Sequence, residues 1–270
     1  MTLREALSHT ARRLAAVSPE EAETEARLIL AHLTGKEPSA LRLFDRELDG
    51  KSLEKLEEMV KRRLSREPLQ YVLGEWYFMG LPFFVSPAAL IPRQDTETLC
   101  EEALRLISER GYKSLLDICT GTGCIAVSLA KLGGAQTEAS DISPECAALA
   151  RRNAERNGVE VTIRTADLFA GAGEYDLITA NPPYITDADM DRLQEEVRFE
   201  PRLALAGGAD GLDIYRRIAK EAGAHIRSGG ALLLEAGLGE AEAVAALFPE
   251  REAAVINDLN GVERVVRIDF

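Results

Sequence analysis

The chain has 270 residues, 46% of them hydrophobic and 29% charged, and carries a formal net charge of -13 at pH 7. This length suits two domains, and the composition is that of an ordinary globular protein. With no run of about 18 apolar residues and no signal-peptide core, we expect a cytoplasmic protein that does not bind membranes. Four cysteines without CxxC spacing and only three histidines argue against a disulfide framework, and we expect no metal site.

The negative charge is concentrated in the C-terminal part of the chain. Residues 1–73 carry 13 acidic and 13 basic side chains, whereas residues 74–270 carry 32 acidic and 19 basic ones. Because such a field repels nucleic-acid phosphates, we expect no stable binding of nucleic acid. The basic cluster of Lys61, Arg62, Arg63 and Arg66 is typical of a solvated helix face.

Apolar residues at helical spacing characterise residues 1–73. They predict three helices, over residues 3–14, 22–33 and 53–64. Ser18, Pro19 and Glu21 have the order of an N-cap followed by the first and third helical residues, so they predict the start of the second helix, and Gly35 predicts its end. The bundle contains no cluster of chemically useful residues, and we interpret residues 1–73 as a helical substrate-recognition domain.

Aromatic and β-branched residues then flank a turn at residues 79–82 and predict a β-hairpin, within a linker over residues 74–93. Residues 94–270 alternate between strand and helix patterns. Strands are predicted over residues 114–118, 137–141, 160–164, 175–180, 231–235, 253–258 and 264–270, and helices from about residue 123 and over residues 147–157 and 212–226. This alternation predicts an α/β fold with a parallel, Rossmann-like sheet covered on both faces, finished by an antiparallel hairpin.

A glycine-rich turn follows the strand at 114–118. Gly121 and Gly123 permit close backbone approach to a ligand, and the helix that follows offers unpaired N–H groups. The pattern is neither the dinucleotide GxGxxG nor the phosphate loop. Asp141, at the end of the next strand, can accept hydrogen bonds from ribose hydroxyls, and Asp167-Leu168 is positioned to meet adenine. This layout resembles that of class I S-adenosylmethionine (SAM) methyltransferases.

The tetrapeptide Asn181-Pro182-Pro183-Tyr184 follows the strand at 175–180. Strand ends of open parallel sheets form ligand sites, so we expect this loop beside the SAM cleft. The side-chain carbonyl of Asn181 and the backbone carbonyl of Pro182 can accept hydrogen bonds from a planar NH2 group, while the Tyr184 ring stacks on its plane. Two fixed acceptors would turn the delocalised lone pair of such a group toward a methyl donor.

Several motifs together resemble the HemK-type protein-(glutamine N5) methyltransferases, and the resemblance covers nearly the whole chain. It is carried by the helical N-terminal domain, the 74–84 hairpin, Ile91-Pro92-Arg93-Gln94-Asp95-Thr96-Glu97, the glycine turn, the Asn181–Tyr184 loop, Phe199-Glu200-Pro201-Arg202-Leu203-Ala204-Leu205 and Gly207-Gly208-Ala209-Asp210-Gly211-Leu212. The resemblance implies a class I SAM-dependent methyltransferase domain over residues 94–270. It also implies transfer of a methyl group from SAM to N5 of the glutamine in the Gly-Gly-Gln motif of peptide chain release factors, with S-adenosylhomocysteine as product.

The same resemblance implies roles for individual residues. SAM contacts are expected from Cys119, Thr120, Gly121, Thr122, Gly123, Asp141, Leu168 and Asn181. Substrate contacts are expected from Asn181, Pro182, Pro183 and Tyr184, with Asn181, Pro182 and Tyr184 as the catalytic residues. The partner would be a release factor, and we expect a monomer. Cys119 stands where many relatives have glycine, Gln94 where proline is common, Leu168 where some have an aromatic ring, and Glu240 where glutamine is frequent.

Two other functions fit part of the pattern. An adenine-N6 nucleic-acid methyltransferase presents the same NH2 geometry to this loop, but it would need a basic groove to hold a flipped base. A SAM-fold binding protein without catalysis would not need both Asn181 and Tyr184. Methyl transfer from SAM to a release factor or to duplex DNA distinguishes these functions.

Overall fold

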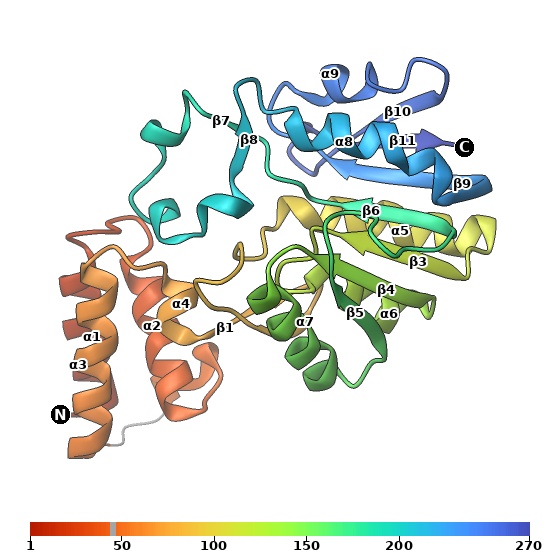
Figure 1. Cartoon of the computed structure of the whole chain (residues 1–270). Helices are drawn as coiled ribbons and strands as arrows, with labels where there is room; N and C mark the ends of the chain where they lie inside the picture. The colour runs from red at the N-terminus through yellow and green to blue at the C-terminus, as the bar shows by residue number, and fades with distance from the viewer. Residues whose placement is uncertain (44–46) are drawn as a thin grey trace. The chain divides into compact units, whose positions relative to one another are not determined.

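The computed structural model describes residues 1–43 and 47–270, which form two compact units. The first unit comprises residues 1–74 and 194–199, and the second comprises residues 75–193 and 200–270 (Figure 1). The segment 194–199 therefore belongs to the first unit although it lies far along the chain. No helix in the described ranges is long and apolar enough to cross a membrane.

The first unit is helical. Its helices are α1 (Leu3–Leu14), α2 (Ala22–Thr34), the short 3-10 helix η1 (Pro38–Leu43), α3 (Gly50–Leu64), α4 (Leu69–Leu73) and the single 3-10 turn η3 (Val197–Phe199). The apolar stripes of α1, α2 and α3 meet in one core that includes Leu14, Ile29, Leu30 and Val60, all almost completely buried. The three helices predicted from apolar spacing are therefore present.

The predicted start of α2 is wrong. The helix begins at Ala22, with Glu21 at the N-cap position and no side-chain cap. Ser18 instead lies in the turn that follows α1, where its backbone N–H donates to the Leu14 carbonyl at 2.9 Å. Gly35 does end the helix, in the left-handed conformation that favours glycine.

The basic cluster is only partly a solvated face, because its arginines are paired within the first unit. Arg63 is only 5% exposed and donates to both carboxylate oxygens of Glu25, at 2.9 and 3.1 Å. A third bond links it to Glu196 at 3.2 Å, and Arg66 also donates to Glu196, at 3.2 Å. Arg62 forms an ion pair with Glu67 at 2.5 Å. Two of these arginines thus hold the segment 194–199 by its acidic side chain.

The second unit is built on a seven-stranded sheet with strand order β10-β11-β9-β6-β3-β4-β5. The strands are β3 (Ser114–Ile118), β4 (Gln136–Asp141), β5 (Val161–Thr165), β6 (Tyr175–Ala180), β9 (Ile226–Glu235), β10 (Glu252–Asn257) and β11 (Glu263–Asp269). The five strands from β9 to β5 are parallel, whereas β11 runs antiparallel to both of its neighbours. The predicted parallel sheet and its closing hairpin are confirmed.

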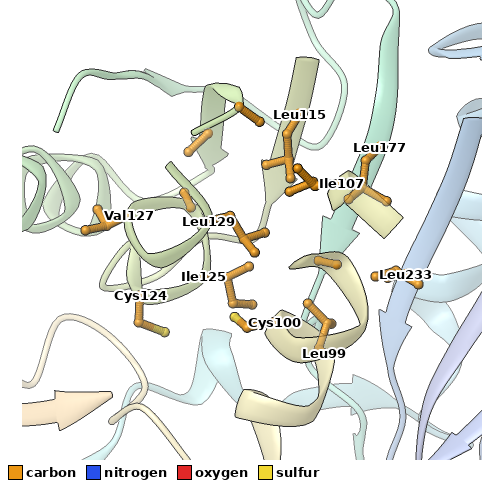
Figure 2. Close-up of a cluster of buried hydrophobic side chains, with 14 of the residues drawn as sticks. Leu99, Cys100, Ile107, Leu115, Cys124, Ile125, Val127, Leu129, Leu177 and Leu233 are labelled. Carbon is orange, nitrogen blue, oxygen red and sulfur yellow. The ribbon is translucent and has the colours of Figure 1, made fainter. Parts of the chain in front are cut away.

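Helices cover both faces of the sheet (Figure 1). They are α5 (Asp95–Arg110), α6 (Cys124–Gly133), α7 (Pro144–Asn157), α8 (Asp213–Glu221) and α9 (Ala241–Ala245), with 3-10 turns η2 (Met190–Arg192), η4 (Arg202–Ala204) and η5 (Ala222–Ala224). Figure 2 shows the core on the α5–α6–α7 side, where Leu99 and Leu129 pack against the strand residues Leu115, Leu177 and Leu233.

The alternate strand residues face the opposite core. Leu116, Ile178 and Leu232 pack there with Tyr215 of α8 and Val244 of α9. Since successive side chains of a strand point to opposite faces, the apolar runs in β3, β6 and β9 supply both layers at once. Helix α5 was not predicted, although Leu99, Ala103 and Leu106 have helical spacing, and the five-residue α9 was also missed.

Two small sheets complete the second unit. The hairpin pairs β1 (Glu75–Phe78) with β2 (Leu81–Phe84) in antiparallel register. In the other sheet β7 (Ile185–Thr186) pairs in parallel with β8 (Ala206–Gly208), and the Ile185 N–H donates to the Leu205 carbonyl at 2.8 Å. The second of these sheets ties the segment after Tyr184 to the chain that follows the Glu200-Pro201 motif.

Candidate active site

A cavity of about 400 Å³ lies at the carboxyl ends of the parallel strands β3, β4 and β6. This volume is within the range of small-molecule sites. Its walls are formed by residues 88–93, Thr96, Cys119, Thr120, Gly121, Thr122, Cys124, Ile125, Asp141, Ile142, Ser143, Glu145, Cys146, residues 166–168, Asn181, Pro183, Pro201, Leu203, Ala204, Ile214 and Arg217. All of these residues belong to the second unit.

The glycine turn forms one wall of the cavity and is wound in the left-handed region. Cys119, Gly121 and Gly123 have φ angles of 56°, 55° and 79°. The turn is closed by a hydrogen bond from the Gly123 N–H to the Thr120 carbonyl at 2.8 Å. Position 119 therefore requires a positive φ, which glycine adopts more readily than cysteine.

Gly123 serves packing, since it does not line the cavity. A Cβ atom there would lie 2.9 Å from the Ala150 Cβ and 3.1 Å from the Ala150 Cα. The neighbouring Asn153, completely buried, accepts a hydrogen bond from the Phe84 N–H and donates from Nδ2 to the carbonyls of Phe84 and Thr122. Helix α7 thereby fastens both the hairpin and the glycine turn.

Asp141 is a largely buried carboxylate in the cavity wall. Its Oδ2 accepts from the Gly121 N–H at 2.8 Å, and its Oδ1 accepts from the Ser143 N–H at 2.9 Å. Burial raises the pKa of this carboxyl, opposed by the two backbone hydrogen bonds. A carboxylate has about four lone-pair directions, so acceptor capacity remains for the hydroxyl groups of a ribose. This donor and acceptor set fits a nucleoside such as that of SAM.

Apolar side chains, among them Ile142 and Leu168, also line the cavity. Ile142 follows Asp141 and is 51% exposed, and Leu168 is nearly buried with a φ of 48°. Asp167 forms an ion pair with Arg217 of α8 at 2.8 Å. Ile142 and Arg217 were not predicted as site residues, although the position of Ile142, directly after the acid at the end of β4, was a sequence signal for it.

Asp117, which precedes the glycine turn, does not reach the cavity. It is fully buried and accepts hydrogen bonds from the Thr120 hydroxyl at 2.5 Å and the Thr179 hydroxyl at 2.7 Å. Burial raises the pKa of Asp117 to about 7, against the lowering effect of these bonds. The acid therefore links the turn to strand β6 from beneath and is not a ligand contact.

Asn181 projects from the end of β6 into the cavity wall beside the glycine turn. Its side-chain Nδ2 donates to the Thr96 hydroxyl at 3.2 Å. Thr96 is at the start of α5, also lines the cavity and is 2% exposed. Because the NH2 end of the amide is bound to Thr96, the carbonyl end of Asn181 is left to accept from another group.

The rest of the Asn181–Tyr184 loop is divided between cavity and interior. Pro183 lines the cavity, whereas Pro182 and Tyr184 do not. A Cβ atom at Gly237 would lie 2.9 Å from Cδ2 of the Tyr184 ring. Burial raises the pKa of Tyr184 to about 12, helped by the nearby Glu235 carboxyl. The phenol is therefore neutral at physiological pH.

The motifs on either side of the cavity are joined by an acid and a base. Glu200 is 6% exposed, forms an ion pair with Arg93 and accepts a hydrogen bond from the Ile91 N–H at 3.2 Å. Burial raises the pKa of Glu200, and the charge of Arg93 lowers it. This pairing joins two motifs that are more than 100 residues apart in the chain.

The structure brings most of the expected residues to one place. Seven of the eight expected SAM contacts line the cavity: Cys119, Thr120, Gly121, Thr122, Asp141, Leu168 and Asn181. The lining residues 88–93, Pro201, Leu203 and Ala204 were not predicted as site residues, although those from Ile91 onward belong to motifs that were recognised.

Comparison with known proteins identifies related sequences over nearly the full length. The PrmC N-terminal domain family matches residues 5–74, and the methyltransferase small domain family matches residues 99–198. A release factor glutamine methyltransferase of Geobacter sulfurreducens is 45% identical over 98% of this chain and 95% of the relative. One from Cereibacter sphaeroides is 42% identical over 98% of both chains.

Solved structures agree on the fold. A methyltransferase from Pyrococcus furiosus aligns with a TM-score of 0.53 at 17% identity, covering 82% of this chain and 98% of that one. The fold and the cavity define the chain as a class I SAM-dependent methyltransferase. At 36–45% identity to the relatives over nearly its full length, it belongs to the release factor glutamine methyltransferase family.

Proposed function

We propose that this protein transfers the methyl group of SAM to the side-chain amide nitrogen of the glutamine in the Gly-Gly-Gln motif of a peptide chain release factor. The observation that carries the proposal is the position of Asn181. Its amide lies in the wall of the cavity that also contains the glycine turn and Asp141, with the NH2 end bound to Thr96. Family membership over nearly the whole chain supports the same substrate class.

The residues of this chain then have separate roles. Asp141 would hold the ribose, and the glycine turn would lie against the methionine part of the donor. When bound, SAM supplies an electrophilic methyl group on a sulfonium centre. The Asn181 side-chain carbonyl and the Pro182 backbone carbonyl would accept hydrogen bonds from the glutamine NH2 and aim its lone pair. The nitrogen forms the new bond to carbon as the sulfur–carbon bond breaks, and one amide proton leaves to water.

The domains have corresponding proposed roles. Residues 1–73 would recognise the release factor, residues 74–93 would link the two domains, and residues 94–270 would carry out methyl transfer. The basic cluster gives no support for recognition, since Arg62, Arg63 and Arg66 are paired internally. We also propose that the protein acts as a monomer. It would not bind nucleic acid stably, because its net charge of -13 repels phosphates.

The direct test measures transfer of tritium from labelled SAM to an unmethylated release factor, with duplex DNA as a second acceptor. We expect labelling of the factor at its Gly-Gly-Gln glutamine and none of the DNA. Labelled adenine in DNA would favour the nucleic-acid alternative, and SAM binding with no transfer to either acceptor would favour a binding protein.

Variants of the loop test the chemistry. Asn181→Ala removes one of two acceptors, so the rate should fall by roughly 10² to 10³. Tyr184→Phe should cost much less, because packing needs the ring and not the hydroxyl, whereas Tyr184→Ala should cost more. Equal rates for Asn181→Ala and the unmodified protein would show that Asn181 has no role in methyl transfer.

A further inference from the structure

A buried carboxyl group lies next to Asn181 and is not used by the reaction as described above. Glu235 is the last residue of β9 and is 2% exposed. Strands β6 and β9 are parallel neighbours in which Ala180 pairs with Leu234, so the residues that follow, Asn181 and Glu235, are also opposite each other. Glu235 does not itself line the cavity. Any effect it has on the substrate must therefore pass through other side chains.

Two polar side chains close to Glu235, those of Thr96 and Asn181, do line the cavity. Thr96 and Asn181 lie close enough to Glu235 to act as hydrogen-bond donors that lower the pKa of its carboxyl, and the charge of Arg264 lowers it further. Its second oxygen, Oε2, is buried without a hydrogen-bond partner in the described structure. Thr96 in turn accepts the hydrogen bond from Nδ2 of Asn181 at 3.2 Å.

These contacts determine which group is the donor and which is the acceptor in each hydrogen bond. An ionised carboxylate can only accept, so the Thr96 hydroxyl must donate its single proton to Glu235. The Thr96 oxygen is then free to accept, which suits Nδ2 of Asn181. An amide has donors at one end and an acceptor at the other, so this arrangement also fixes where its carbonyl points. A reversed amide would place its carbonyl oxygen against other acceptors.

We propose that Glu235 and Thr96 form a positioning relay that holds the Asn181 carbonyl toward the glutamine NH2 during methyl transfer. The proposal rests on the proposed function and assigns Glu235 as a positioning residue, because it touches neither substrate nor donor. The relay keeps an acceptor in place before the substrate arrives, which is how a preorganised polar group lowers a barrier.

The relay depends on the charge of Glu235, and that charge depends on pH. Burial raises the pKa of Glu235 to about 7, against the partners that lower it. Below this pH the protonated carboxyl can donate to Thr96 and compete with Asn181. Methyl transfer should therefore slow as the pH falls below about 7.

The other charged or titratable groups that interact with Glu235 come from five elements or loops. They are Arg264 on β11, Asp95 and Cys100 on α5, Cys124 on α6, Tyr184 after β6 and Tyr215 on α8. Arg264 is paired with Asp95 at 3.2 Å. The two cysteines and two tyrosines have raised pKa values because they are buried, so they stay neutral near pH 7. Glu235 is thus the member of this set whose raised pKa lies close to neutral pH.

The experiment compares full-length Glu235→Gln, Thr96→Val and Thr96→Ser with the unmodified protein. Glu102→Gln is the matched control, because Glu102 is also a buried glutamate of the second unit, paired with Arg105 and Arg267 and outside the cavity. Tritium transfer to an unmethylated release factor gives kcat and KM between pH 5.5 and 8.5. Calorimetry gives the SAM affinity, and thermal unfolding checks that each variant is folded.

We expect Glu235→Gln and Thr96→Val each to lower kcat roughly tenfold or more, with SAM affinity nearly unchanged. The decline of kcat below pH 7 should disappear in Glu235→Gln, and Thr96→Ser should recover most of the rate lost in Thr96→Val. The double variant Glu235→Gln/Thr96→Val should be no slower than the slower of its two single variants, because the effects of residues in one relay are not additive.

Two results would overturn the relay while leaving the proposed function intact. One is a Glu235→Gln protein with the kcat and pH profile of the unmodified enzyme, and the other is a Thr96→Val protein with undiminished kcat. If Glu235→Gln failed to fold, Thr96→Val against Thr96→Ser would still decide, since that comparison leaves the carboxyl in place. An unmodified protein that transfers no methyl group to the factor would overturn the proposed function, and the relay with it.

Discussion

Cys119 carries a side chain at a backbone position that favours glycine. It has a φ of 56° in the glycine turn, where a Cβ atom is strained, and glycine would remove that strain. Burial and the neighbouring carboxyls of Asp141 and Asp117 raise the pKa of the Cys119 thiol far above its ordinary value. The thiol is therefore inert, and its presence is a packing matter and not a chemical one.

The strain at this position can be measured by comparing Cys119→Gly with Cys119→Ala. Both changes remove the sulfur, but only glycine relieves the Cβ strain. We expect Cys119→Gly to be more stable than Cys119→Ala by about 1 kcal/mol in urea unfolding, after allowing for the greater entropy of unfolded glycine. Elsewhere in a chain alanine is usually the more stable of the two, so equal stability, or a more stable alanine variant, would show that the turn is not strained at this residue.

Asp117 makes stability depend on pH. Its pKa is raised to about 7 in the folded protein by burial, above the ordinary value of 3.8. A carboxyl with a raised folded pKa contributes stability that is complete below pH 4 and is lost as the pH rises through 7. At about 1.4 kcal/mol per pKa unit, the loss is of the order of a few kcal/mol.

The test is urea unfolding at pH 5 and pH 7.5 for the unmodified protein and for Asp117→Asn. An amide of the same shape cannot ionise, so the variant should lose less stability between the two pH values. Glu235 also has a pKa raised to about 7, but it is present in both proteins and cancels from the comparison. An equal pH dependence in both proteins would mean that Asp117 does not titrate in this interval.

At the scale of elements, the contact between the glycine turn and α7 depends on one missing side chain. Gly123 and Gly134 precede and follow helix α6, and both have positive φ, 79° and 66°. A Cβ atom at Gly123 would meet the Ala150 backbone within 3.1 Å, whereas one at Gly134 would meet nothing within 4 Å. Conformational strain is therefore common to both glycines, and a steric clash occurs at only one.

We expect Gly134→Ala to cost about 1 kcal/mol of stability and Gly123→Ala to cost 1–3 kcal/mol more, because an overpacked contact adds to the strain. Urea unfolding of the two variants measures the difference. SAM affinity should also fall in Gly123→Ala, since the turn must shift away from α7. Similar stabilities for the two variants would show that α7 moves easily and that the contact does not set the turn.

Another group of glycines surrounds Tyr184. Cβ atoms at Gly207 and Gly211 would lie within 2.7 Å of the Tyr184 backbone, and one at Gly237 would lie 2.6 Å from the Glu240 carboxylate. Glu240 has a buried oxygen without a partner, and burial raises its pKa. Glutamine at this position would avoid burying a charge, which gives a physical reason for the residue that relatives frequently carry there.

At the scale of the whole molecule, the cavity and the proposed recognition domain are separate along the chain. Every residue that lines the cavity lies in the second unit. A protein consisting of residues 74–270 should therefore bind SAM with nearly unchanged affinity and fail to methylate a folded release factor. Calorimetry and tritium transfer measure the two properties.

The truncation also removes Arg63 and Arg66, which hold the segment 194–199. A short Gly-Gly-Gln peptide is therefore needed as a second acceptor. Methylation of the peptide but not of the folded factor would assign residues 1–73 to recognition. Full activity of the truncated protein on the folded factor would contradict that role.

The sequence by itself determined the order of strands and helices in the second unit and the motifs that form its cavity. Strands β3 and β6 lie at the predicted residues, because a buried strand bounded by turn residues is a local pattern. Parallel strands place their carboxyl ends at one edge of the sheet, so the sequence alone predicts that Gly121, Asp141 and Asn181 lie together.

Tertiary structure alone decided which side chains became partners. The start of α2, the internal pairing of Arg63 with Glu25 and the meeting of Thr96, Asn181 and Glu235 have no local signature. The reason is that partners depend on strand register and helix packing over long separations in the chain. A periodic pattern shows that a residue is buried, but only the folded chain shows which group satisfies its charge or hydrogen bond.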